Sequence, residues 1–491
     1  MNRYFPVLTS LLFLTLCWML LVSCQQKQEK SPLPPNIVLI VADDHGTADM
    51  SFLNRLSDVQ TPHLDALARK SVYFSQAYAS SPICSPSRMS ILTAVFSQRF
   101  GTYWYGGEGI HKPAYQTIPE LLKQKRYATA YIGKVHYGSG KFDSDPNHRN
   151  FPNNHGFDYF FGHTSARKHY LIHKDEEEEA FIAVKEEQKR TGQTLRKQSF
   201  WRNKEKVDTL AFSTEMIGNE ARQFIQQHPS SPFFLQVSFN AVHNFTHQLP
   251  ETYLKQHNLS GYHDWDPLTE DYYEWYQAGR YPNNPEGRAH YLGQLYYLDQ
   301  EIGKLMTTLE EMEIAENTVV IYIGDNGGST PIYANNSPLR GSKYLLYEGG
   351  LRVPLLISYP KHFPANTHLN NVVSGMDLLP TICALAGVPI PTNIDGFDLS
   401  PLLDGTNPAL AHDTLYWDTG HERAIRVGNW KWHEAVSDRS ATYEMVELEL
   451  GQSLRNLASD IEERADLSDS NADKARELEA ALGRWQAAMK E

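Results

Sequence analysis

The stretch NIVLIVADD, residues 36–44, gives the clearest indication of the fold. Its first seven residues are almost all apolar, and such a run without alternation is typical of a strand buried on both faces of a parallel sheet. The run leads directly into Asp43 and Asp44. A second stretch of the same form, TVVIYIGDN at residues 318–326, ends in an Asp–Asn pair. Open α/β folds place their sites at the carboxyl edge of such strands, so we expect both polar pairs there.

Oxygen-bearing side chains should therefore converge at one edge of the sheet: Asp43, Asp44, Asp325 and Asn326. Carboxylate and amide oxygens are hard ligands, and neither pair offers sulfur or imidazole. An Asp–Asp pair alone is more often a helix cap or a turn at a strand end. The two pairs together predict a site for Ca2+, with Mg2+ as the alternative, rather than for Zn2+.

The stretch CSPSRMSILTA, residues 84–94, places a lone cysteine at the start of a helix. Pro86 suits the first helical turn, where its missing N–H costs nothing. That end of a helix attracts anions, and Arg88 adds a charged fork of donors that suits a tetrahedral oxyanion. The pattern favours a site for sulfate or phosphate, and the alternative for the motif alone is a buried, inert cysteine.

These residues resemble the type I sulfatase family of the alkaline-phosphatase-like superfamily. Residues 84, 86 and 88 match its signature CxPxR, and the longer pattern CSPSRxxxLTG is matched except at Ala94, where glycine is usual. The resemblance implies that Cys84 is oxidised to formylglycine by an export-linked modification enzyme. It also implies that the VADDHG and GDNGG motifs, which contain the two polar pairs, bind the metal together with the modified Cys84.

Further segments extend the resemblance along most of the chain. Lys134 and His136, in GKVH, resemble the lysine and histidine that flank the modified cysteine. His243 resembles the histidine that contacts the sulfate, although its two neighbours depart from the usual residues. Lys343 resembles the lysine on the leaving-group side. A single histidine or lysine is weak evidence, but the order of all these motifs along the chain supports the family.

The resemblance implies a covalent mechanism carried by the following side chains: Cys84, Arg88, Lys134, His136, His243, Asp325 and Lys343. Hydrated formylglycine would attack sulfur with help from Asp325, while the arginine and lysines stabilise charge on the sulfuryl oxygens. His243, with Lys343, would assist the leaving alcohol. His136 would then accept a proton so that the aldehyde reforms and sulfate leaves.

Strand and helix patterns alternate along the chain without an internal repeat. We expect an α/β fold, with a large mixed, mostly parallel sheet sandwiched by helices and a small C-terminal antiparallel sheet plus helix. The predicted parts are a lipoprotein signal peptide with lipobox (1–24), a tether (25–35), a catalytic sulfatase domain (36–395) and a C-terminal subdomain (396–491). In the last helix a capping pair of Ser470 with Asp473 is predicted, and these residues share one apolar face: Leu478, Leu482, Trp485 and Met489.

The N-terminal residues predict where the protein is located. Arg3 followed by an apolar stretch at residues 7–22 is typical of an export signal, because the stretch is short for a membrane span. Residues 21–24 resemble the lipobox of bacterial lipoproteins, which implies cleavage before Cys24 and lipidation of its sulfur; an ordinary signal peptide is the alternative. We expect an exported protein in the periplasm or at the cell surface, attached to a membrane only through this lipid.

Composition limits the partners and the cysteine chemistry. A net charge of −13 over 491 residues opposes binding to nucleic acid. Outside the signal only Cys84 and Cys383 remain. A disulfide between them is possible by count, although modification of Cys84 would preclude it, and Cys383 lies in an apolar stretch typical of a core helix.

The expected partners are a sulfated small molecule or glycan and the formylglycine-forming enzyme, with the oligomeric state left open. An aromatic stretch at residues 251–291 suggests a surface on which sugars stack, although core packing is the alternative for each ring. Two other functions stay open. One is phosphodiester or phosphonate monoester hydrolysis on the same scaffold, and the other is carbohydrate binding by a protein whose cysteine is never modified.

Overall fold

The computed structural model describes residues 34–143, 145–164, 170–172, 200–207, 211–261, 263, 269–437 and 448–490. The chain divides into two units, Met1–Pro34 and Pro35–Glu491, and all elements below belong to the second. The predicted signal peptide, its lipobox at Cys24 and nearly all of the tether lie outside the described residues. Within the described ranges, no helix combines the length and the apolar character that crossing a bilayer requires.

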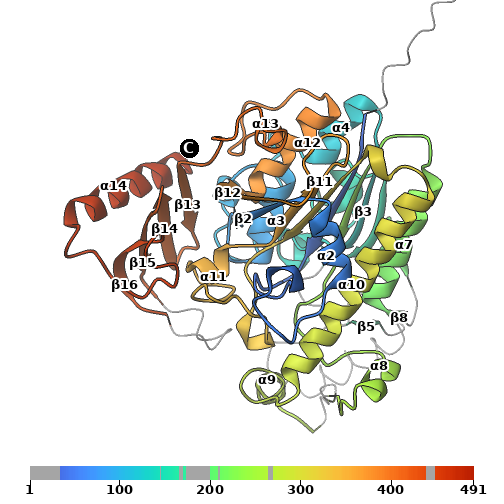
Figure 1. Cartoon of the computed structure of the whole chain (residues 1–491), viewed down its shortest axis with the longest axis horizontal. Coiled ribbons are helices and arrows are strands. Elements are labelled where there is room, and N and C mark those ends of the chain that lie inside the picture. The colour runs from blue at the N-terminus through green and yellow to red at the C-terminus, as the bar shows by residue number, and fades with distance from the viewer. Residues whose placement is uncertain are drawn as a thin grey trace, which may run out of the picture. The chain divides into compact units, whose positions relative to one another are not determined.

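A ten-stranded mixed sheet forms the centre of the second unit (Figure 1). Its strand order is β12-β2-β11-β10-β1-β9-β3-β4-β6-β7, and the run from β10 to β4 is parallel throughout. The strands are β1 (Asn36–Ala42), β2 (Val72–Tyr78), β3 (Ala128–Lys134), β4 (Tyr159–His163), β6 (Phe200–Arg202), β7 (Glu205–Val207), β9 (Phe233–Ser238), β10 (Thr318–Gly324), β11 (Leu355–Ser358) and β12 (Thr367–Ser374). A separate pair joins β5 (Leu171–Ile172) to β8 (Ala211–Phe212). The predicted mixed, mostly parallel sheet is confirmed.

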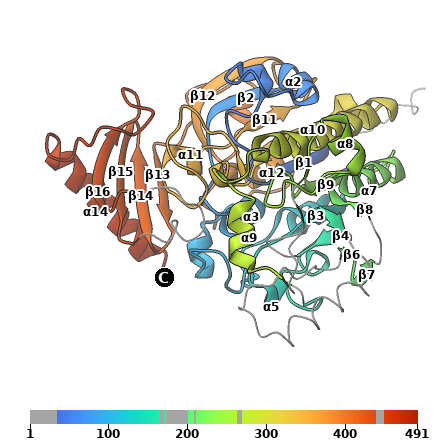
Figure 2. The same cartoon turned by 90° about the horizontal axis from the view of Figure 1, so that it is seen from below.

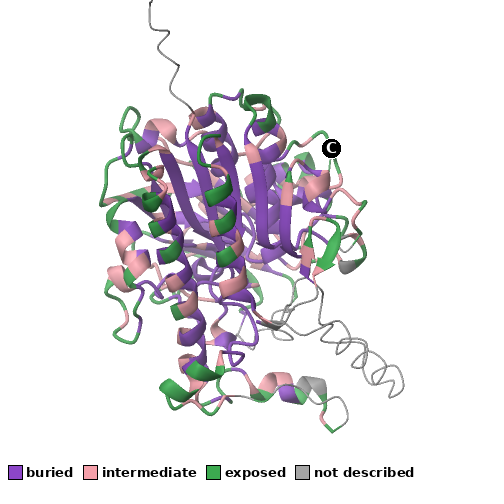
Figure 3. Cartoon of the chain, turned by 90° about the vertical axis from the view of Figure 1, so that its right-hand side faces the viewer, coloured by how far each residue is buried: buried purple, intermediate pink, exposed green. Residues whose placement is uncertain are grey.

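Helices cover both faces of this sheet. One layer contains α2 (Pro62–Arg69), α7 (Ser213–Gln227) and α10 (Gly287–Glu311), and the other contains α3 (Cys84–Thr93), α4 (Ile118–Leu122) and α12 (Leu378–Ala386). In β1, residues 37, 39 and 41 belong to the core under α3 and α12, whereas residues 38, 40 and 42 belong to the core under α7 and α10. Figure 3 shows the central strands buried along their length. Burial on both faces explains the unbroken apolar run.

Shorter elements complete the chain. The remaining α-helices of the central part are α5 (Gly140–Asp143), α8 (Glu251–Gln256), α9 (Tyr272–Ala278), α11 (Glu348–Leu351) and α13 (Ser400–Leu403). Single 3-10 turns are η1 (Ser51–Leu53), η2 (Ser97–Phe100), η3 (Lys123–Lys125), η4 (Pro152–Asn154), η5 (Ala315–Asn317), η6 (Thr330–Ile332) and η7 (Gly375–Asp377).

The C-terminal part is a four-stranded antiparallel sheet covered by a helix, as predicted. Its strands are β13 (Thr414–Asp418), β14 (Glu422–Val427), β15 (Trp430–Ala435) and β16 (Gly451–Asn456), and the helix is α14 (Ala472–Ala488). The four residues predicted on the apolar face of α14 are buried with Ile425 and Trp432 of the sheet. The domain boundary at residue 395 stays a prediction.

The predicted cap of α14 is wrong. Asn471 occupies the N-cap position and no side-chain hydrogen bond caps the helix. Ser470 Oγ instead donates to the carbonyl of Leu467 at 3.1 Å, within the turn that precedes the helix. Asp473 forms an ion pair with Arg476. Ser470 stands one residue before the N-cap position, so it is not the residue whose side chain would cap the first turn.

Buried charges join the C-terminal sheet to the central part, and Figures 1 and 2 show α11 at this junction. Lys431 of β15 lies 2.9 Å from Glu348 Oε1 and 2.9 Å from Glu463 Oε1, and all three side chains are buried. Glu463 also accepts the backbone N–H of Glu348 at 2.6 Å. Burial alone would raise the pKa of Glu348, but Lys431 and Arg352 lower it below its ordinary value. This network fixes the start of α11, shortly after Lys343.

Candidate active site

The predicted site residues meet where three strands end and one helix begins. Strand ends and the helix start supply Asp43, Asp44, Cys84, Lys134, Asp325 and Asn326. Strands β1 and β10 are direct neighbours, with Ala42 paired to Gly324, so the two polar pairs leave the sheet side by side. None of the predicted site residues is more than 6% exposed. The expected meeting of distant chain segments at this edge is confirmed.

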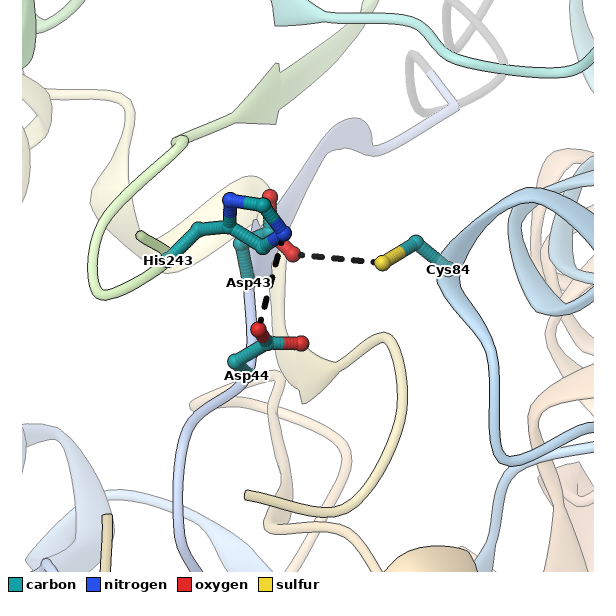
Figure 4. A group of neighbouring side chains, drawn as sticks. All are labelled: Asp43, Asp44, Cys84 and His243. Carbon is teal, nitrogen blue, oxygen red and sulfur yellow. Dashed lines mark hydrogen bonds and ion pairs between the residues drawn. The ribbon is translucent and has the colours of Figure 1, made fainter. Parts of the chain in front are cut away.

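Cys84 points toward the first aspartate (Figure 4). Its Sγ donates to Asp43 Oδ1 at 3.6 Å. Cys84 and Cys383 are both free and buried, so the disulfide that the count allowed is not formed. Burial raises the pKa of the Cys84 thiol, and Lys134 and Lys343 offset this only in part. An unmodified thiol here is protonated at neutral pH and is therefore a poor nucleophile.

Two cations hold Asp43 and Asp325. Lys134 Nζ forms an ion pair with Asp43 Oδ2, and Arg88 Nη2 lies 3.6 Å from the same oxygen. Arg88 Nε donates to Asp325 Oδ2 at 2.8 Å, and its Nη1 donates to the carbonyl of Lys134 at 3.0 Å. Burial and the nearby Asp325 raise the pKa of Asp43 to about 7. Burial also favours a higher pKa for Asp325, but the charges of Arg88 and Lys134 outweigh it, so the pKa of Asp325 is lowered.

Asp44 lies at the centre of a second set of contacts. Lys343 Nζ is 2.8 Å from Asp44 Oδ2, and His243 Nε2 is 3.7 Å from the same oxygen (Figure 4). Asn326 Nδ2 donates to Asp44 Oδ1 at 2.8 Å. The backbone of Asp44 has a φ of 57°, a left-handed conformation that non-glycine residues adopt mainly where surrounding contacts impose it.

The oxygen atoms of this cluster fit a divalent cation. Asn326 Oδ1 is buried and has no hydrogen-bond partner among the described residues. Such an atom costs about 1–3 kcal/mol unless another group satisfies it. One ligand atom from each of Asp43, Asp44, Cys84 and His243 lies within 4.8 Å of the others. Carboxylate and amide oxygens suit Ca2+ or Mg2+, and a cation at this place would satisfy the unpaired oxygen.

The predicted ligands and the predicted substrate contacts lie close together in the structure. His243, predicted to meet the sulfate, lies in the same compact group as Asp43 and Asp44. The two oxygens of Asp325 accept hydrogen bonds from Arg88 and from the backbone of Asp44. All predicted residues are therefore brought together, and the assignment of each one as ligand or catalyst stays a prediction.

His136 lies just beyond β3, beside the start of α3. Ser85 Oγ donates to the carbonyl of Tyr137 at 2.7 Å, which ties this segment to the helix. Burial lowers the pKa of His136 well below its ordinary value, and Lys134 and Arg88 lower it further. Its Nδ1 is buried and finds no hydrogen-bond partner in the described part of the chain. The imidazole is therefore neutral at pH 7 and has a nitrogen lone pair that can accept a proton, as a weaker base than an exposed histidine.

Sequence reasoning missed His163. This residue ends β4 in register with Lys134 of β3 and is fully buried. It is one of the neighbours that lower the pKa of His136. Its strand, YFFGH, is an apolar run that ends in a polar residue, which is the same signal that identified Asp43 and Asp325.

The aromatic stretch at residues 251–291 is only partly a surface. Trp275 is 4% exposed and stacks on Phe245 with ring centroids 6.0 Å apart, so it belongs to the core. Tyr281 is 57% exposed. Tyr262 and Trp265, which also belong to this stretch, lie outside the described residues.

Known proteins show the same combination of fold and motifs. The sequence model of the Sulfatase family matches residues 35–388, and that of N-sulphoglucosamine sulphohydrolase, C-terminal, matches residues 342–468. The N-acetylgalactosamine-6-sulfatase of Sus scrofa is 30% identical over 427 residues, which cover 82% of this chain and 72% of that protein. The N-acetylgalactosamine-6-O-sulfatase of Bacteroides thetaiotaomicron is 26% identical over 552 residues, covering 98% of each chain.

A solved structure of another protein has a fold similar to that of this chain. Ps i-CgsB in complex with k-i-k-neocarrahexaose superposes with a TM-score of 0.73 at 28% identity, over 92% of this chain and 93% of that one. The family model covers most of the chain, including both polar pairs and the helix that begins at Cys84. The chain belongs to the sulfatase family and is a sulfuric ester hydrolase.

Proposed function

We propose that this sulfatase removes sulfate from a sulfated carbohydrate, using a formylglycine at position 84 and a Ca2+ ion. The observation that carries the proposal is the buried cluster in which Cys84 contacts Asp43 and the unpaired Asn326 Oδ1 lies with the carboxylates. The relatives named above include N-acetylgalactosamine-6-sulfatases and a protein solved with a neocarrahexaose. These relatives support a glycan as the substrate.

Asp43, Asp44, Asp325 and Asn326 would hold the ion, together with the modified residue 84. The modified residue supplies the nucleophile, and the cation supplies positive charge beside it. The other steps of the proposal belong to side chains that the structure describes, and the positions of the basic residues and histidines support the roles proposed for them.

The basic side chains of the site interact with the sulfate group. Arg88, Lys134 and Lys343 are buried and lie around the carboxylates that face Cys84. Preorganised charges in a buried site stabilise the charge that develops on the sulfuryl oxygens. His243 Nε2 and Lys343 Nζ lie 3.7 and 2.8 Å from Asp44 Oδ2, and in this proposal they donate a proton to the leaving oxygen. The neutral His136 accepts a proton at Nδ1 when the product is released.

Matched esters separate this proposal from the phosphorus alternatives. We expect kcat/KM for 4-nitrophenyl sulfate to exceed that for bis(4-nitrophenyl) phosphate and for a phenyl phosphonate ester by about tenfold or more, which is about 1.4 kcal/mol of transition-state binding. A screen of sulfated mono- and oligosaccharides then identifies the sugar. Faster turnover of the phosphorus esters would contradict the proposed function.

Removal of divalent cations should slow the enzyme. Because the ion would contribute charge next to the nucleophile, exhaustive chelation is expected to lower kcat by a factor on the order of 10²–10³. Added Ca2+ should restore the rate more fully than Mg2+. The Asp44→Asn variant should need more Ca2+ for half-maximal activity, since it loses one anionic ligand. An unchanged rate after metal analysis shows complete removal would rule out the proposed ion.

We also propose that residues 1–24 direct export and that Cys24 carries a lipid. The lipobox resemblance at residues 21–24 supports this, and the polar tether after it gives the catalytic part reach. In a bacterial host the wild type should incorporate labelled fatty acid and sediment with membranes. The Cys24→Ala variant should lose the label while keeping sulfatase activity. A labelled Cys24→Ala protein would contradict lipidation at this residue.

A further inference from the structure

Rings from three separate segments gather next to Lys343, and we call them the aromatic rim: Trp104, Tyr105, Tyr344 and His421. Tyr344 directly follows Lys343, whose Nζ lies 5.3 Å from the centre of the tyrosine ring. Trp104 stacks on Tyr344 with centroids 5.4 Å apart and planes 25° from parallel. His421 meets Trp104 edge-on at 5.4 Å, and Tyr105 lies next to Trp104 with centroids 6.0 Å apart.

Hydrogen bonds fix the segments that carry this rim. The backbone N–H of Tyr344 donates to the carbonyl of Pro82 at 2.9 Å, just before Cys84. The carbonyl of Gly107 accepts the backbone N–H of Ser139 at 2.9 Å, which ties the loop of Trp104 to the segment after His136. Gln98 Nε2 donates to the carbonyl of Asp418 at 2.7 Å, so the same loop is tied to the end of β13. The rim is therefore held in place relative to the catalytic side chains.

Core packing does not account for these rings. Tyr105 is 40% exposed, and Trp104, Tyr344 and His421 are half-buried. None of the four belongs to a hydrophobic core cluster of the described residues. Trp104 Nε1 is covered and finds no hydrogen-bond acceptor among those residues, and the ring contacts of the indole are with the other three rings.

We propose that the aromatic rim is a subsite for the sugar next to the sulfated one, an inference that rests on the proposed function. Flat rings with polar edges bind the apolar faces of pyranose rings and hydrogen-bond their hydroxyl groups. Tyr344 directly follows Lys343, and Trp104 stacks on Tyr344. A glycan that places its sulfate among the cations of the site therefore brings the neighbouring sugar onto Trp104.

The test compares a sulfated monosaccharide with a longer glycan that contains it. The probes are N-acetylgalactosamine 6-sulfate with a chondroitin 6-sulfate tetrasaccharide, and galactose 4-sulfate with k-i-k-neocarrahexaose. Each is assayed for turnover and as an inhibitor of 4-nitrophenyl sulfate hydrolysis. In the wild type the longer member of at least one pair should bind about tenfold more tightly. The Trp104→Ala variant should lose this advantage through KM, with binding of the monosaccharide changed by about twofold at most.

The control is Tyr296→Ala, which removes another exposed ring, one that contacts Tyr253 and Tyr297 rather than the rim. It should keep the wild-type preference. If Trp104→Ala does not fold by circular dichroism, Trp104→Leu keeps an apolar side chain without the flat face and should show the same selective loss. A wild type without preference for either longer glycan, or an equal loss on both members of a pair, overturns the subsite. A wild type that hydrolyses no sulfate ester overturns the proposed function and the subsite with it.

Discussion

Replacing Cys84 by alanine is expected to abolish sulfate ester turnover, with kcat reduced by a factor on the order of 10⁵–10⁶, as for loss of other catalytic nucleophiles. The reason is that residue 84 would supply the nucleophile, while the neighbouring cations only stabilise charge. The fold should persist, because the sulfur makes a weak contact with Asp43 at 3.6 Å. Steady-state rates with 4-nitrophenyl sulfate and thermal unfolding of the same preparation measure both effects.

Cys383 offers the matched control, since it is the other buried, free cysteine in the described part of the chain. It lies in α12, within the hydrophobic core, and Cys383→Ala should keep the wild-type kcat. Cys84→Ser should release at most one product per protein, because a serine hydroxyl can form a sulfate ester but cannot eliminate it. Peptide mass spectrometry of the exported wild type should show an aldehyde at residue 84. A thiol there in fully active protein would contradict the mechanism.

The Lys343→Ala variant is expected to lose activity in a way that depends on the leaving group. Lys343 Nζ lies 2.8 Å from Asp44 Oδ2 and is 2% exposed, next to His243. If it assists the departing oxygen, kcat should fall by a factor on the order of 10²–10³ for a sulfated sugar. The fall should be smaller for 4-nitrophenyl sulfate, whose leaving group needs little help. Parallel kcat measurements on the two substrates check this.

Lys70→Ala is the control, because Lys70 forms an exposed pair with Glu310 at 2.7 Å and both side chains are about half exposed. Exposed pairs contribute little, so neither substrate should respond. An equal loss on both substrates in Lys343→Ala would indicate that the lysine only holds Asp44 in place. Activity at the wild-type level would remove Lys343 from the site.

The part of the fold and site that the sequence predicts is the part carried by strand ends. Residues 36–42 and 318–324 are continuous apolar runs because both faces of their strands are buried, and the same runs point to the polar pairs that follow. Parallel neighbours carry those pairs to one edge, as β1 and β10 do. A short motif at a helix start then adds Cys84 and Arg88. These patterns lie within short stretches, so a single sequence is enough to detect them.

Contacts between side chains from distant segments leave no such pattern in the sequence. Trp104, Tyr344 and His421 come from three segments, and no local pattern shows that their rings meet. Trp275 lies in an aromatic stretch that resembles a binding surface, yet it is 4% exposed because the chain folds it against Phe245. Composition predicts that rings are present, and tertiary packing decides which of them face solvent.

The contacts of Lys431 and Glu463 with Glu348 connect the C-terminal part of the chain to the segment that carries Lys343. A fragment that stopped at residue 388, where the match to the family model ends, would retain all the side chains assigned to chemistry. It would nevertheless lose Lys431 and Glu463, so Glu348 would keep Arg352 as an ion-pair partner but lose its contact with Lys431 and the hydrogen bond that holds its backbone N–H. Replacing the C-terminal part would therefore also replace two of the charged groups that surround Glu348. A chimera is expected to keep Lys343 aligned only if the donor part brings a cation and a carboxylate in the places of Lys431 and Glu463.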